Sequence, residues 1–426
     1  MLHSIKKRLY FVVAAYFTFW AKIVLRRWQP RIIVVTGSSG KTTLLHLIEA
    51  QLGTRASYSH HANSAFGISF QLLGLEPNVL SISKWPLYVL VAPFRIWRRI
   101  PNTKLYVVEA DCDRPREGKF SANFLRPEVT LWVSVHRTHS MNFDSLVSNG
   151  KFATHEGAIA NEFGGFVAAT TKLVAVNSDQ DELVEQLARA AQGVQTERVS
   201  TKAITSYIVQ PDSTVFSFGQ KKITLPGLHP REVGIALQLV DTLLRYLDLP
   251  LDSTYKQLTL PPGRSTIFKG KKGTTLIDST YNTGLGATVA LLGLFQAYPA
   301  THKWLVIGDI LEQGSLEQEE HKKLVVEIAN AKPEHVILLG KRTKAHTYSL
   351  LQKELPSSVV VSFLTAGEVL KYLQQQIRGG EAIMFKGAQG LEGVVEQLLA
   401  SPSDAQQLVR RETSWVKRRQ AWGLPK

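Results

Sequence analysis

The sequence contains one cysteine and no apolar run long enough to cross a bilayer. Among 426 residues only Cys112 is a cysteine, which excludes intrachain disulfides and zinc sites built on several cysteines and is typical of a reducing compartment. The apolar stretch 9–21 ends at Lys22, short of the roughly 20 residues that a spanning helix needs. A fixed-period repeat, a low-complexity tract and a convincing secretory signal are also missing from the sequence. These absences favour a globular, cytoplasmic protein.

Acidic residues are outnumbered, with 35 aspartates and glutamates against 50 lysines and arginines. The resulting charge of +15 favours anionic partners such as nucleotides, nucleic acids or the inner membrane surface. The basic residues do not form one stripe interleaved with stacking aromatics, so we expect no nucleic-acid partner.

Two stretches, 9–21 and KWPLYVLVAPFRIWRR at 84–99, are both aromatic and flanked by basic residues. This pattern is typical of a helix that lies on a membrane, and also of a helix packed on a protein core. We expect the N-terminal helix to make a peripheral contact with the inner face of the membrane, with core packing as the alternative.

Short β-branched runs alternate with helical patterns along most of the chain. The expected strands of the first half are 31–37, 105–110, 129–135 and 166–177, and those of the second half are 274–282, 303–309, 335–340 and 381–387. Such alternation indicates α/β units with mostly parallel sheets covered on both faces.

The stretch VVTGSSGKTTL at 34–44 lies between an expected strand and an expected helix. The common phosphate-binding loop has a glycine five positions before its Gly-Lys pair, where this chain has Val35, so the loop is a shortened one. Backbone N–H groups of such a loop wrap phosphate oxygens, its lysine reaches the β- and γ-phosphates, and the next hydroxyl binds Mg²⁺. We therefore predict ATP and Mg²⁺ here, held by the loop residues Gly37, Ser38, Ser39, Gly40, Lys41, Thr42 and Thr43.

Two later strands are followed by groups that could hold the metal. Glu109 ends the strand in YVVEADCDRP, where a carboxylate beside a phosphate-binding loop can reach Mg²⁺ directly or through water. His136 and His139 follow the strand in VSVHRTHSMNF. We predict His139 as a second metal-binding residue, with capping or packing as the alternative for these histidines.

The blocks TGSSGKTT, EADCDRPREG, HRTHSMNF, GLHP, PPGR, LIDSTYN, VIGDILEQG and KGAQGLEGVVEQL occur in this order between residues 30 and 400. Together they resemble the Mur ligase family, and within it the MurF branch, which adds D-alanyl-D-alanine to a muramoyl-peptide of the peptidoglycan precursor. The resemblance implies a P-loop central ATPase domain at 30–262 and a smaller Rossmann-like α/β domain at 263–426, after an amphipathic helix at 1–29.

The resemblance also implies roles for residues. Lys41, His139 and Arg264 would serve catalysis, Arg264 by reaching the γ-phosphate from the C-terminal domain, and Thr42, Glu109 and His139 would hold the metal. Asp278 would contact the ribose, and Tyr281 and Asn282 would border the nucleotide. A weaker match suggests substrate-binding roles for Asn63, Asp309, Glu312, His321 and Lys386.

The chain departs from the family pattern at three points. Phe163 stands where the family usually has a carbamylated lysine, and Lys151 lies in an apparent insertion. In GLHPREVG, His229 is retained while Pro230 and Val233 replace asparagines. The domain that in MurF grips the uridine nucleotide has no counterpart in the roughly 30 residues before the first core strand.

These departures keep other functions open. One alternative is a ligase of the same fold that acts on another carboxylate, such as a poly-glutamate or a lipid-linked precursor. The other is a non-catalytic nucleotide-binding scaffold, which Phe163 favours and the retained Lys41, Thr42, Glu109 and His139 oppose.

Overall fold

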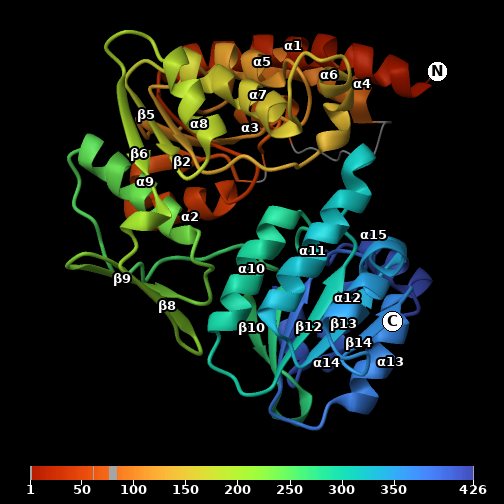
Figure 1. Cartoon of the computed structure of the whole chain (residues 1–426). Coiled ribbons are helices and arrows are strands. Elements are labelled where there is room, and N and C mark those ends of the chain that lie inside the picture. Colours follow the sequence, from red (N-terminus) through yellow and green to blue (C-terminus); the bar gives the residue numbers. More distant parts are fainter. Residues whose placement is uncertain (1, 61, 76–83, 426) are drawn as a thin grey trace. The chain divides into compact units, whose positions relative to one another are not determined.

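The computed structural model describes residues 2–60, 62–75 and 84–425 (Figure 1). The chain forms two compact units, residues 1–201 with 235–252 and residues 202–234 with 253–426. The predicted domain limits at 1–29, 30–262 and 263–426 stay a prediction. By compactness, the chain passes from one unit to the other after residues 201, 234 and 252.

The first unit is built on six parallel strands in the order β2-β3-β1-β4-β5-β6. The strands are β1 (Arg31–Thr36), β2 (Ala56–Tyr58), β3 (Leu105–Ala110), β4 (Val129–Trp132), β5 (Leu173–Asn177) and β6 (Gln195–Val199). Chain order reverses around β1, which lies between β3 and β4. The carboxyl ends of these three strands therefore border the crevice where open α/β sheets bind ligands.

Helices cover both faces of this sheet (Figure 1). They are α1 (Leu2–Trp28), α2 (Lys41–Leu52), α3 (Ala65–Leu73), α4 (Trp85–Val91), α5 (Glu117–Leu125), α6 (Asp144–Ser148), α7 (His155–Ala169), α8 (Asp181–Gln186) and α9 (Val233–Tyr246), with short 3-10 turns η1 (Gly53–Arg55), η3 (Ala92–Trp97), η4 (Ser140–Asn142) and η5 (Leu187–Arg189). Ile32 and Val34 of β1 share a core with α1, α3, α5 and α7. Ile33 and Val35 point to the other face, because neighbouring strand residues alternate.

One expected strand was partly wrong. We predicted a strand over 166–177, but residues 166–169 belong to α7 and only Leu173–Asn177 forms β5. Phe166 and Val167 are buried on α7, which begins at a Thr154 cap and continues its helical spacing through them. A short apolar run does not distinguish the end of a buried helix from the start of a strand.

The core-packing alternative for the first apolar stretch is confirmed for one face of α1, and the membrane contact stays a prediction. Phe17, Ala21 and Val24 are buried in the core, whereas Val12 and Phe19 are 64% and 58% exposed. In the described part of the chain, no helix combines the length and the apolar character needed to cross a membrane.

The second unit contains a six-stranded sheet in the order β10-β11-β15-β12-β13-β14, in which β10 alone runs antiparallel to its neighbour. Its strands are β10 (Thr266–Lys269), β11 (Thr275–Ser279), β12 (Lys303–Gly308), β13 (His335–Leu339), β14 (Val360–Phe363) and β15 (Ala382–Lys386). Its helical segments are α10 (Leu285–Ala297), α11 (Glu317–Ala331), α12 (Ser349–Glu354), α13 (Ala366–Gln376), α14 (Leu391–Leu398) and α15 (Thr413–Ala421). The short 3-10 turns are η6 (Thr201–Ala203), η7 (Lys271–Gly273), η8 (Gly314–Leu316) and η10 (Pro402–Gln407), and η9 (Thr343–Tyr348) is a π-helix.

Alternate residues of this sheet enter two separate cores. Leu305 and Ile307 of β12 pack with α10 and α11, while Trp304 and Val306 pack with α13 and α14. A small antiparallel sheet of β7 (Ser206–Val209), β8 (Ser213–Phe218) and β9 (Lys221–Pro226) belongs to the same unit. The fold therefore consists of two α/β units of the predicted kind, and the second unit also contains this small antiparallel sheet.

Candidate active site

The loop between β1 and α2 depends on two glycines with positive φ. Gly37 has φ 132°, and a Cβ there would lie 2.7 Å from the carbonyl oxygen of Ser134. Gly40 has φ 82° and caps α2. Ser38 and Ser39 donate their backbone N–H groups to the carbonyl oxygen and the hydroxyl of Ser134, at 2.9 and 3.0 Å. These bonds fix the loop on the end of β4, while the first N–H groups of α2 have no intrahelical acceptor and can serve an anion.

Lys41 is a buried cation held by a carboxylate. Its Nζ lies 2.7 Å from Oδ2 of Asp111 and donates to the carbonyl oxygen of Gly37 at 2.5 Å. Burial alone would lower the pKa of Lys41, but the carboxylates of Asp111 and Glu109 outweigh it and raise the pKa above its ordinary value. The ammonium group therefore stays charged at the mouth of the loop, where a polyphosphate would need it.

Thr42 and Glu109 meet as predicted for a metal site. The hydroxyl of Thr42 donates to Oε2 of Glu109 at 2.9 Å, and the backbone N–H of Glu109 donates to the hydroxyl of Ser59 at 2.7 Å. Glu109 ends β3 and is 8% exposed. A hydroxyl and a carboxylate are hard oxygen donors, so this pair fits Mg²⁺, which uses one or two carboxylates and keeps several waters.

His139 pairs with a carboxylate that the sequence reasoning missed. Its Nε2 lies 3.5 Å from Oδ1 of Asp113, and its backbone has the left-handed φ of 52°. Burial raises the pKa of Asp113, and the carboxylate of Asp111 raises it further. The three acids of EADCD thus occupy alternate positions, with Glu109 near the end of β3 and Asp111 and Asp113 directly after it. That alternation was the available signal, since every second residue of an extended segment points to one side.

Two other residues near this loop are now placed. Asn63 is exposed, and its carbonyl oxygen accepts the backbone N–H of Asp111 at 2.8 Å, which puts its segment beside the acids. Phe163 is 1% exposed, and its ring centroid lies 5.7 Å from that of Trp132 in the core. Phe163 is therefore a core residue on α7.

The second unit gathers four of its predicted residues at the ends of β11 and β15. The guanidinium of Arg264 lies 4.7 Å from the ring centroid of Tyr281. Asp278 is fully buried and its Oδ1 accepts the backbone N–H of Thr280 at 2.9 Å. Burial raises the pKa of Asp278 to about 6. Burial also lowers the pKa of Lys386 to about 8, and the nearby Arg264 lowers it further while Asp278 opposes the shift.

Arg410 is a further residue that the sequence reasoning missed in this region. It donates to the carbonyl oxygens of Thr280 and Tyr281 at 2.8 and 2.9 Å, so it holds the loop after β11. Asn282 is exposed, and its Oδ1 accepts the backbone N–H of Thr283 at 2.8 Å. No motif marked Arg410, because it lies about 130 residues from the loop that it supports.

The other residues with weakly predicted substrate-binding roles differ in how exposed their side chains are. Asp309 is 1% exposed and accepts from Thr343 and from the Gln389 amide, at 2.8 and 3.1 Å. His321 is fully buried, and its Nδ1 lies 2.9 Å from the Thr347 hydroxyl. Glu312 is exposed, with φ 63°. The geometry favours a positioning role for Asp309 and His321, and their predicted substrate contacts stay predictions.

Comparison with known proteins shows which proteins this chain is similar to. The profile of the Mur ligase, glutamate ligase domain matches residues 263–389. The UDP-N-acetylmuramoyl-tripeptide–D-alanyl-D-alanine ligase of Bacillus subtilis (strain 168) is 25% identical over 402 residues, which cover 90% of this chain and 79% of the relative. The ligase of the same name from Synechocystis sp. is 24% identical and covers 88% of this chain and 76% of the relative. Residues 263–389 thus match the Mur ligase C-terminal family model, and nearly the whole chain is similar to MurF ligases.

Solved structures agree on the MurF fold. MurF ligase from Thermotoga maritima in complex with ADP has a TM-score of 0.69 at 17% identity and covers 89% of this chain and 81% of that protein. MurF from Acinetobacter baumannii has a TM-score of 0.70 at 18% identity, with coverages of 91% and 80%. The solved structures therefore show the fold of this chain, and the Thermotoga maritima protein is a complex with ADP.

Proposed function

We propose that this MurF-like chain is an ATP-dependent ligase that adds D-alanyl-D-alanine to a muramoyl-peptide. The observation that supports it most is the pairing of Lys41 with Asp111 and of Thr42 with Glu109, at 2.7 and 2.9 Å. A non-catalytic scaffold would not need a charged lysine and a carboxylate–hydroxyl pair at the same loop. The relatives that carry this activity by name match nearly the whole chain.

The proposed reaction has two steps. A substrate carboxylate oxygen attacks the γ-phosphorus of ATP, and the bond from that phosphorus to the β–γ bridging oxygen breaks. ADP is the leaving group, and the substrate becomes an acyl phosphate. The amine of D-alanyl-D-alanine then attacks the acyl carbon, loses a proton, and expels phosphate as the amide forms. Both steps transfer groups between negatively charged reactants, so catalysis consists mostly of positioning and charge neutralisation.

The residues of the first unit suit this task. The Lys41 ammonium and the N-terminal N–H groups of α2 would neutralise the β- and γ-phosphates. Thr42 and Glu109 would hold Mg²⁺, which supplies further charge neutralisation when bound. His139 and Asp113 lie 3.5 Å apart and would complete the metal environment or order its water.

The predicted residues of the second unit have roles of their own in the proposal. Arg264 would meet the γ-phosphate and Asp278 the ribose, and Tyr281 and Asn282 would border the nucleotide. Lys386 would lie near the incoming amine substrate.

Mass spectrometry of a complete reaction tests the proposal. Purified protein is incubated with ATP, Mg²⁺, UDP-muramoyl-tripeptide and D-alanyl-D-alanine, and a muramoyl-pentapeptide is expected. Lys41→Ala should abolish the product, whereas Lys323→Ala, which removes an exposed lysine paired with Glu319 on α11, should not. Absence of product together with absence of ATP-dependent phosphate release would contradict the ligase. Product formed only from a lipid-linked or poly-glutamate acceptor would replace the proposed substrate.

A surface of exposed apolar side chains on the first unit supports a peripheral contact with a membrane. Exposed apolar side chains of α1, α4 and η3 form this surface, which we call the apolar ridge: Val12, Phe19, Leu87, Val89, Leu90, Phe94 and Trp97. The Tyr16 hydroxyl donates to the carbonyl oxygen of Val89 at 2.6 Å, so α1 and α4 lie side by side. Exposed Lys22, Lys84, Arg95 and Arg99 flank the ridge. Apolar and aromatic groups bordered by basic ones fit a bilayer surface with anionic lipids.

Vesicle sedimentation tests this contact. The protein should sediment with vesicles rich in phosphatidylglycerol and much less with pure phosphatidylcholine vesicles. Leu90→Ser should weaken sedimentation, whereas Val326→Ser, at a similarly exposed residue of α11, should leave it unchanged. Equal sedimentation of both variants would refute the ridge as the contact.

A further inference from the structure

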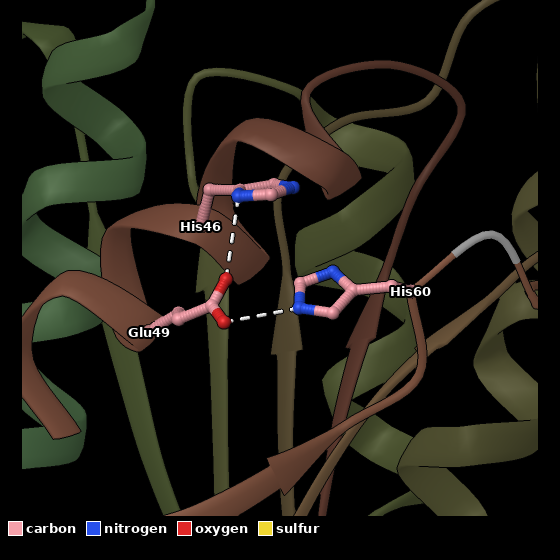
Figure 2. Close-up of side chains that lie close together, drawn as sticks. All are labelled: His46, Glu49 and His60. Atoms are coloured by element: carbon pink, nitrogen blue, oxygen red, sulfur yellow. Dashed lines mark hydrogen bonds and ion pairs between the residues drawn. The ribbon is translucent and has the colours of Figure 1, made fainter. Parts of the chain in front are cut away.

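Three side chains outside the proposed ATP site converge beside the phosphate-binding helix. His46 and Glu49 come from α2 and His60 from the segment after β2, and Figure 2 shows the Glu49 carboxylate facing both rings. Nδ1 of His46 lies 3.3 Å from Oε2 of Glu49, and Nε2 of His60 lies 3.0 Å from Oε1. Within the described residues this is the one group of three or more histidine, cysteine and acidic side chains whose potential ligand atoms all lie within 4.8 Å of one another.

Local structure brings these groups together. His46 and Glu49 are three residues apart on a helix, and such residues share a face. The segment of His60 is fixed from both sides, because the Tyr58 hydroxyl donates to the carbonyl oxygen of Gly53 at 2.8 Å and the Ser59 N–H donates to that of Val107 at 3.0 Å. The convergence therefore belongs to the folded backbone and does not depend on long, mobile side chains.

The donor set suits a particular class of ion. We propose that His46, Glu49 and His60 bind a divalent transition-metal ion of the Zn²⁺ type, with water completing its coordination. Two imidazoles and one carboxylate are a known zinc ligand set, and imidazole favours Zn²⁺, Co²⁺ and Ni²⁺ over Mg²⁺. Two ligand atoms about 2.1 Å from one ion at a tetrahedral angle lie about 3.4 Å apart, close to the spacings seen here. The three side chains are 13%, 34% and 36% exposed, so an ion and its water can enter.

Such an ion would connect two parts of the ATP site. His46 lies one turn, about 6 Å, along α2 from Thr42. His60 follows Ser59, whose hydroxyl accepts the backbone N–H of Glu109. The ion would thus tie the helix that carries Thr42 to the segment that supports Glu109, at a site distinct from the Mg²⁺ pair. We expect it to stabilise the first unit by an amount that grows with the logarithm of the ratio of its concentration to its dissociation constant.

Metal titration of the full-length protein tests the inference. After chelation and dialysis, Zn²⁺ should bind at one equivalent by calorimetry and raise Tm, Co²⁺ should give visible absorption bands, and Mg²⁺ should not compete. His46→Ala, His60→Ala and Glu49→Gln should each weaken Zn²⁺ binding by about tenfold or more. Glu49→Gln keeps the side-chain shape, so a loss there does not arise from misfolding.

The chain offers a matched control. His302 and Glu334 also form an exposed pair, with Nδ1 3.1 Å from the carboxylate, but no third ligand of the described residues joins them. His302→Ala should bind Zn²⁺ as the unmodified protein does. Absence of saturable binding up to about 0.1 mM Zn²⁺, or equal binding by His46→Ala and His302→Ala, would overturn the proposal. The three groups would then be only a hydrogen-bonded His-Glu-His cluster.

Discussion

The two units each bury a lysine near the carboxyl end of a parallel strand, yet their surroundings act in opposite directions. Lys41 follows β1 and Lys386 ends β15, and each is 6% exposed. The pKa of Lys41 is raised above its ordinary value despite burial, because Asp111 and Glu109 face it. The pKa of Lys386 is lowered to about 8, because burial is reinforced by Arg264 and only partly opposed by Asp278. Burial alone does not set the charge of a lysine; the neighbouring charges decide it.

This difference separates two kinds of chemistry. Lys41 is a permanent cation, which suits a polyphosphate that must be held in every cycle. Lys386 can lose its proton near neutral pH, so its charge can respond to the substrate and to pH. Substitutions at the neighbours of each lysine can break or sharpen the contrast.

The largest effect should come from the metal carboxylate of the first unit. Glu109→Gln keeps the hydrogen bond from Thr42 but removes the charge, and we expect ligase turnover to fall about 100- to 1,000-fold, as when one preorganised electrostatic group is removed. Product formation is measured over a Mg²⁺ titration, with Glu185→Gln on the surface of α8 as the control. Turnover of Glu109→Gln within threefold of the unmodified enzyme at high Mg²⁺ would exclude Glu109 from the metal site.

The next substitution makes Lys41 resemble Lys386. Asp111→Asn removes the charged partner at 2.7 Å, so burial should dominate and lower the pKa of Lys41. Loss of a charge-assisted hydrogen bond of about 1.5–3 kcal/mol corresponds to roughly 10- to 150-fold in kcat/KM. The variant should also lose activity at alkaline pH.

The control for this prediction is Asp181→Asn, at an exposed aspartate in the first turn of α8. Measurement of kcat/KM from pH 7 to pH 10 distinguishes the two variants. If Asp111→Asn and Asp181→Asn had the same pH profile, the contrast between the two lysines would not depend on Asp111.

A third prediction concerns stability in the second unit. The pKa of Asp278 is raised to about 6 from 3.8, so between these pH values the folded state keeps a proton that the unfolded state has lost. Stability from this group is present at low pH and is lost as pH rises to about 6, by about 3 kcal/mol at most. Asp278→Asn should therefore flatten this part of the profile and increase stability at pH 7.

Urea unfolding between pH 4 and pH 7, without nucleotide, measures this effect. Asp404→Asn in η10 provides the comparison, because its carboxylate is not fully buried. A variant Asp278→Asn that is less stable than the unmodified protein at pH 7 would show that the carboxylate charge is needed for folding.

The smallest effect should be a shift in pH dependence. If the Lys386 ammonium meets a substrate, activity should decline as pH rises through about 8. Lys386→Arg keeps its charge at alkaline pH, so the declining limb should move upward, with several-fold more activity at pH 9 relative to each plateau. An unchanged limb in Lys386→Arg would assign it to another group.

Features that depend on adjacent residues, such as the loop and the ends of strands, could be predicted from the sequence. The loop at Gly37–Thr42 was recognisable because glycine, lysine and threonine must follow one another there. The end of β3 indicated Glu109, and the structure brings it to Thr42. Where periodicity was ambiguous, as over 166–177, the end of a helix was taken for a strand.

Contacts between distant segments were not accessible in the same way. Phe163 was interpreted as standing where the family has a lysine, which stays a prediction, whereas its packing against Trp132 could not be read from the sequence. The alternation of Asp113 with Glu109 and Asp111 was visible in the sequence, but its contact with His139 depends on the fold. Arg410 was missed because it reaches a loop about 130 residues away. Neither contact follows a fixed spacing in the chain.

By itself the sequence determined the two α/β units, the shortened phosphate-binding loop and the basic character of the protein. These depend on hydrophobic periodicity, on glycine conformations and on composition, all of which are local or summed properties. Tertiary structure alone decided the opposite pKa shifts of the two lysines and the meeting of His46, Glu49 and His60. Electrostatic fields and ligand sets depend on distances of a few ångströms, and only chain packing sets those distances.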